Sequence, residues 1–134
     1  MEIAATPKPV ALIHDAPFWQ SINDREMRLQ RCADCQEWTY PSAPICPRCS
    51  SENSSWERIN GTGEILSWVV FHKTYLPAYP APHKVIAVRL DEGPIIISNL
   101  EGAEPEGSWI GHKVSLCYTE MPDGVLLPRF ELVT

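Results

Sequence analysis

Two pairs of cysteines constrain the fold of this chain more than any other feature. Cys32 and Cys35 form one Cys-X-X-Cys pair, and Cys46 and Cys49 form a second pair. A two-residue gap lets one tight turn present two thiolates to the same metal ion, so two such turns complete a tetrahedral four-thiolate site. The pattern predicts one structural zinc ion, which stabilises the fold and leaves no position for water or substrate.

Other interpretations of the cysteines stay open at the level of sequence. Four thiolates also suit iron, which would make the chain an electron carrier, and the pairs could instead be ordinary buried thiols or a redox pair. The fifth cysteine, Cys117, lies between Leu116 and Tyr118 in an expected strand. We expect it to be a core or barrel-wall thiol and not a nucleophile, because structural buried cysteines are the common case.

Charge and hydropathy narrow the classes of function. The formal net charge is −6, whereas proteins that bind nucleic acids usually carry a basic face. We find no apolar run of about 18 residues, so no membrane span is expected. The N-terminal residues lack the basic-then-apolar pattern of a secretory signal, and paired free cysteines fit a reducing compartment, so we expect a cytoplasmic protein.

The pattern along the chain predicts a mainly β protein. Residues 1–14 are expected to form a flexible tail, and residues 15–55 a helix, beginning with Asp15 as N-cap, and a metal-binding ribbon whose first strand covers 27–31. Near Trp56 the pattern changes, and residues 56–134 contain five candidate strands, bounded by turn residues, which favour a small closed barrel. These strands cover residues 63–72, 84–91, 94–100, 113–121 and 125–133.

A long loop rich in proline and tyrosine separates the first two of these strands. Phe71, His72, Tyr75 and Tyr79 lie in or beside it and could offer stacking and hydrogen-bonding groups to an adenine, a pantetheine arm or a protein partner. The alternative is a rigid loop that only covers one end of the barrel. The histidines show no spacing typical of a catalytic triad or metal site, so no catalytic residues are predicted.

Several short motifs, spread over nearly the full length, resemble a known family. Its members combine an N-terminal helix, a rubredoxin-like zinc ribbon and a C-terminal OB-fold, and were long classed as a domain of unknown function. Gln36 and Ser50 depart from its pattern, which often has glycine after each cysteine pair. The motifs are Phe18-Trp19, Leu29-Gln30-Arg31-Cys32, Tyr40-Pro41, Cys46-Pro47-Arg48-Cys49, Gly61-Thr62-Gly63, Leu90-Asp91-Glu92-Gly93, Ile110-Gly111-His112-Lys113-Val114 and Leu127-Pro128-Arg129-Phe130.

The resemblance implies that residues 56–134 form a five-stranded OB-fold and that the chain is a non-catalytic accessory subunit. Such proteins bind thiolase-superfamily enzymes, which make or break carbon–carbon bonds or transfer acyl groups on coenzyme A thioesters. Steroid side-chain aldolases of the lipid-transfer-protein type are one context. The resemblance also implies two copies in a hetero-oligomer and contact with the acyl-CoA substrate. The alternative is a nucleic-acid-binding module, since OB-folds and zinc ribbons both serve that role, although the acidic charge disfavours it.

Overall fold

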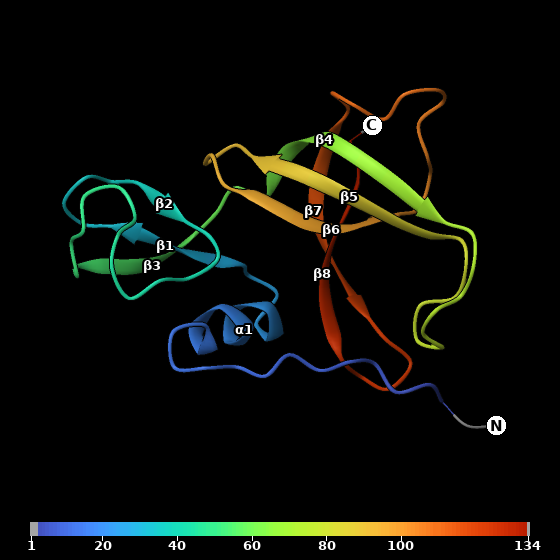
Figure 1. Ribbon diagram of the computed structural model, residues 1–134, viewed down its shortest axis with the longest axis horizontal. Coiled ribbons are helices and arrows are strands. Elements are labelled where there is room, and N and C mark those ends of the chain that lie inside the picture. The colour runs from blue at the N-terminus through green and yellow to red at the C-terminus, as the bar shows by residue number, and fades with distance from the viewer. Residues whose placement is uncertain (1–2, 134) are drawn as a thin grey trace.

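The N-terminal half of the fold is one short helix beside a small antiparallel sheet. The computed structural model describes residues 3–133. Strand β1 lies in the centre of the sheet, between β2 and β3, and all pairings are antiparallel. Figure 1 shows this ribbon beside the barrel, with the helix below it. The elements are α1 (Ala16–Asn23), β1 (Arg28–Cys32), β2 (Trp38–Thr39) and β3 (Ser54–Arg58).

The C-terminal half is a closed five-stranded barrel. Its strand order is β4-β5-β6-β8-β7, and β7 returns to pair with β4. Only the β6–β8 pair is parallel. This Greek-key order is that of an OB-fold, which confirms the predicted mainly β class with helix, ribbon and OB barrel. The strands are β4 (Thr62–Phe71), β5 (His83–Leu90), β6 (Ile95–Glu101), β7 (Lys113–Glu120) and β8 (Leu126–Leu132).

Each predicted strand of the barrel corresponds to an observed one, with ends that differ by one residue at most. The N-terminal part differs more. The predicted boundary near Trp56 falls inside β3, which pairs with β1 through Arg58, so the ribbon sheet continues beyond that position. Asp15 occupies the N-cap position of α1 but makes no side-chain capping bond; its Oδ1 instead accepts a hydrogen bond from the Leu12 N–H.

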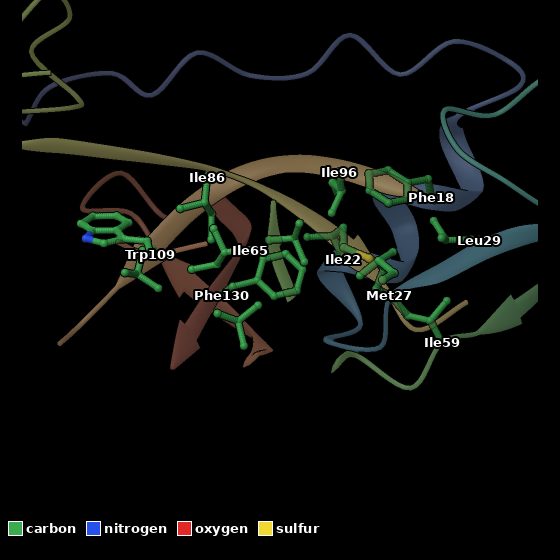
Figure 2. Close-up of a cluster of buried hydrophobic side chains, with 14 residues drawn as sticks. Phe18, Ile22, Met27, Leu29, Ile59, Ile65, Ile86, Ile96, Trp109 and Phe130 are labelled. Atoms are coloured by element: carbon green, nitrogen blue, oxygen red, sulfur yellow. The ribbon is translucent and has the colours of Figure 1, made fainter. Parts of the chain in front are cut away.

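One hydrophobic core joins the helix, the ribbon and the barrel. Figure 2 shows Trp109 at one end of this core and Phe18, Ile22 and Met27 at the other, with Phe130 between them. All five side chains are at most 5% exposed. The barrel contributes the inward-facing side chains of its strands, which alternate along the sequence. The helix contributes residues 18 and 22, which are four apart and so lie on one face of α1. The two halves therefore cannot separate without exposing apolar surface.

Polar contacts also tie the ribbon to its neighbours. The buried Ser21 hydroxyl on α1 donates to the Phe18 carbonyl and accepts from the Arg28 N–H at 3.0 Å. The Met27 N–H donates to the Tyr118 hydroxyl on β7 at 2.7 Å. Within the barrel, close packing requires glycine at position 63, because a side chain there would collide with the backbone of Arg89 on β5.

Hydrogen bonds at Thr6 attach the N-terminal segment to the barrel. Thr6 is only 3% exposed, although the tail was not expected to be buried. Its N–H donates to Asp123 Oδ2 at 2.7 Å, and its hydroxyl donates to Asp123 Oδ1 at 2.9 Å. Figure 1 shows the segment running past α1 toward the β7–β8 turn. Within residues 3–133, no helix has the length and hydropathy needed to cross a bilayer.

We predict that Tyr118→Phe destabilises the fold. The substitution removes the acceptor of the Met27 N–H and leaves a buried donor without a partner, at a cost of about 1–3 kcal/mol. Urea unfolding followed by fluorescence measures this change. Tyr75→Phe is the matched control, because the Tyr75 side chain is 70% exposed. Equal unfolding free energies for the two variants would contradict the assigned contact.

We also predict that the Thr6 attachment depends on pH. The hydrogen bond from the Thr6 N–H lowers the pKa of Asp123 below its ordinary 3.8, so the attachment is fully formed above that value. It weakens as the pH falls through the lowered folded-state pKa, because the carboxylate then becomes protonated. The protection factor of the Thr6 amide against hydrogen exchange should fall in this range. Asp123→Ala, which removes both acceptor oxygens, should lower the protection factor already at neutral pH, and an unchanged value would argue against the attachment.

Candidate metal centre and barrel-end pocket

Two equivalent turns present the four cysteines. In the first, the Gln36 N–H donates to the Cys32 carbonyl at 3.0 Å, and in the second, the Ser50 N–H donates to the Cys46 carbonyl at 2.9 Å. Gln36 has φ 65° and Ser50 has φ 64°, which is the left-handed region that favours glycine. Because glycine adopts this conformation without strain, the conformation explains why the family that the sequence resembles often has glycine at these two positions.

The four thiols converge on one point. All four Sγ atoms lie within 4.8 Å of one another. Cys32 Sγ is 3.5 Å from Cys49 Sγ, and Cys35 Sγ is 3.6 Å from Cys46 Sγ. A tetrahedral ion with bonds of about 2.3 Å has sulfur–sulfur edges of about 3.8 Å, so the donor set fits zinc. The four cysteines form a zinc-ribbon site.

The pKa values of the thiols also indicate that a cation belongs at this site. Hydrogen bonds, that of the Cys35 N–H foremost, lower the pKa of Cys32 to about 6 and outweigh the opposite effect of burial. The Ser51 N–H acts to lower the pKa of Cys49, but the hydrogen bond with Cys32 and desolvation together raise it to about 12. Four thiols this close cannot all ionise beside one another without a positive charge between them. A divalent ion supplies that charge and makes every sulfur a ligand.

The proposed contact loop divides into two groups of side chains. The Phe71 and Tyr75 rings meet edge to face at 6.0 Å, and the Tyr79 ring stacks on His83 at 5.1 Å. His83 also lies 6.1 Å from Phe71, so these four side chains form one aromatic cluster. His72 lies apart and lines a separate open hollow with Glu104. The structure therefore brings together three of the four predicted contact residues, and adds His83.

A pocket of about 340 Å³ opens beside this cluster. Tyr79 lines it from the loop, His83 from the start of β5, Asn99 from β6 and Arg129 from β8, at the end of the barrel where OB-folds bind their ligands. Burial and the nearby Arg129 charge lower the pKa of His83, so its ring is neutral at neutral pH. A neutral imidazole stacked on a phenol offers a flat surface to a planar group.

Arg129 is the charged group of this pocket. Its side chain is 13% exposed, and Nη1 donates to Glu101 Oε1 at 2.5 Å. Its Nε–H is buried and, within the described part of the chain, has no hydrogen-bond partner. A buried donor without a partner is costly. Lys84 adds a second cation at the rim, paired with Glu104 at 3.7 Å.

Sequence reasoning missed His83, Asn99 and Arg129 as pocket residues. They come from three strands that meet only when the barrel closes, so no local spacing connects them. The available signal was the Leu127-Pro128-Arg129-Phe130 motif, which contains the arginine.

The remaining cysteine does not line the pocket. Cys117 is half-buried on β7, and desolvation raises its pKa to about 11, as expected for a barrel-wall thiol.

Two family models match the chain in succession. Residues 19–55 match the model described as "ChsH2, rubredoxin-like zinc ribbon domain", and residues 56–119 match "ChsH2, C-terminal OB-fold domain". Among solved structures, the "Ltp2-ChsH2(DUF35) aldolase" superposes with a TM-score of 0.86 and 31% identity, over 95% of this chain and 100% of that one.

Two curated proteins that are similar to this chain differ from each other in length and in name. The "Probable enoyl-CoA hydratase alpha subunit" of Thermomonospora curvata is 35% identical over 128 residues, which are 95% of this chain but only 40% of that protein. The "DUF35 domain-containing scaffold protein" of Pyrococcus furiosus is 25% identical over 117 residues, covering 82% of this chain and 85% of that protein. With both domains matched in order and the aldolase chain covered in full, this protein belongs to the DUF35 family, with a ChsH2-type zinc ribbon and OB-fold.

Proposed function

We propose that the chain is a non-catalytic accessory subunit. It binds a thiolase-superfamily protein, helps to form the acyl-CoA site of that partner, and so supports carbon–carbon bond cleavage or formation, or acyl transfer. The observation that carries this proposal is the barrel-end pocket, which has a stacking surface at Tyr79 and His83 and the Arg129 guanidinium in its wall, but no serine, threonine or cysteine among its lining residues.

The chemistry of the remaining groups supports a subunit without its own reaction. Within residues 3–133, no hydrogen bond or ion pair joins a histidine to a serine, a cysteine or a carboxylate, so no general base activates a nucleophile. The Cys117 thiol is protonated at neutral pH. The metal centre uses all four ligands and leaves no position open.

The relatives' names agree with such a role. One is called a scaffold protein, another is called a hydratase alpha subunit, and the matching structure is named as an aldolase with two components. A scaffold that completes another protein's acyl-CoA site would have the features of the barrel-end pocket. Two copies of this chain with a partner dimer, in the cytoplasm, complete the proposed assembly.

We further propose that Cys32, Cys35, Cys46 and Cys49 hold one zinc ion per chain. The ion cross-links the two turns and neutralises the thiolates, and it takes no part in catalysis. Since the ribbon shares the core with the barrel, its folding also fixes α1 and the strand-to-barrel connection at Ile59.

We predict that a double substitution, Cys32→Ser with Cys46→Ser, lowers zinc content from one ion per chain to near none. It removes one ligand from each turn, so the two remaining thiols cannot close a tetrahedron. Elemental analysis of the purified, colourless protein measures the change. Cys117→Ser is the control and should keep full zinc content. Iron at one atom per chain, with its visible colour, would contradict the zinc assignment.

We predict that the chain forms a stable complex when co-expressed with a thiolase-like protein encoded beside it. Tyr75→Ala combined with Tyr79→Ala should weaken that complex by tenfold or more, as expected for aromatic anchors of an interface worth about 1.4 kcal/mol or more in total. His112→Ala, an exposed residue outside the loop, is the control. Size-exclusion chromatography and titration measure both effects. Separate elution of the two proteins, with the partner fully active alone, would refute the proposal.

A further inference from the structure

A second pocket lies between α1 and the ribbon, away from the metal centre and the barrel end. Its volume is about 260 Å³. Phe18 and Trp19 line it from α1, Tyr40 from the segment after β2, Trp56 from β3, and Leu29 from β1. Figure 2 shows Phe18 and Leu29 close together at the helix end of the core. Four aromatic side chains therefore line one small pocket, each of them also packed in or against the core.

The aromatic rings support one another, so the pocket keeps its shape without a ligand. The Phe18 ring meets Trp19 edge to face, with centroids 5.1 Å apart, and lies 5.6 Å from Tyr40. Desolvation raises the pKa of Tyr40, so its phenol stays uncharged at neutral pH. Preformed walls reduce the ordering cost that binding would otherwise have.

One negative charge stands at this pocket. Asp15 is among the lining residues, and Oδ1 accepts one hydrogen bond, from the Leu12 N–H. No ion pair within residues 3–133 neutralises Asp15. Aromatic faces attract cations through their quadrupole, and a carboxylate beside them adds a charge-assisted hydrogen bond. The positive end of the α1 dipole offsets part of the Asp15 charge, but the attraction of a cation to the aromatic rings is unaffected.

We propose that this pocket binds a basic side chain, an arginine in particular, presented by a protein that docks beside the ribbon. The guanidinium is planar, stacks on aromatic rings and can donate to the Asp15 carboxylate. The ribbon already contains such a pair of its own, since the Arg31 guanidinium lies 4.9 Å over the Trp38 ring. This inference rests on the proposed function in one respect: the protein that presents the arginine is the proposed thiolase-like subunit.

The test titrates the full, zinc-loaded chain with two small probes that differ in charge. Nα-acetyl-arginine amide carries the cation, and Nα-acetyl-citrulline amide has the same shape without it. The indole N–H signals of Trp19 and Trp56 in NMR spectra report binding. The arginine probe should bind at least about threefold more tightly, which is the lower end of what a cation–aromatic contact provides.

Two variants locate the charge. Asp15→Asn should reduce the preference for arginine over citrulline to the part that the aromatic rings provide, because the amide keeps the shape and the acceptor for the Leu12 N–H but not the charge. Asp24→Asn, which removes the same charge at the other end of α1, should leave the preference intact. Equal binding of both probes would mean an apolar pocket, and absence of shifts at Trp19 and Trp56 would mean no site; either result overturns the inference. Because no partner is present, the outcome is independent of whether the proposed complex forms.

Discussion

The convergence of four thiols is the constraint on which the N-terminal half of the structure depends. The ribbon sheet has strands of five, two and five residues, which is too little surface for a sheet to be stable alone. Its main buried apolar side chain beyond the cysteines, Leu29, points into the core shared with the barrel. The centre of the ribbon itself therefore has no hydrophobic core, and a metal ion must take the place of one.

We propose that stability and function lie in different parts of this arrangement. The four cysteines belong to the ribbon, which shares its core with α1 and leads through Ile59 into β4, so the proposed role of the metal centre is structural. The barrel in turn holds the pocket at Tyr79, His83 and Arg129, whose residues come from different strands. A rigid closed sheet is a suitable base for such a pocket, because side chains on strands are held more accurately than side chains on loops. We propose that the exposed loop then provides a contact surface.

Much of this architecture could be predicted from the sequence, because the signals were local. The cysteine pairs fix the turns, and alternation with Gly-containing turns gives the barrel strands. The rest depends on tertiary closure. Strand β3 was missed because the polar residues before Trp56 suggest a loop, whereas pairing with β1 makes them a strand. His72 was grouped with Phe71, although it follows the last residue of β4 and lines a separate hollow. Arg129 and Thr6 could not be placed, since their partners lie far away in the chain.

The central claim is that function resides on the barrel-end surface, where another protein docks. Hydrogen exchange followed by mass spectrometry, on the chain alone and with the thiolase-like protein added, tests it directly. The account predicts slower exchange in the loop between β4 and β5, around Tyr75 and Tyr79, with little change at the two cysteine turns, which the proposed zinc ion already holds in the free chain. Unchanged exchange in that loop, or protection confined to the turns around Gln36 and Ser50, would contradict the account.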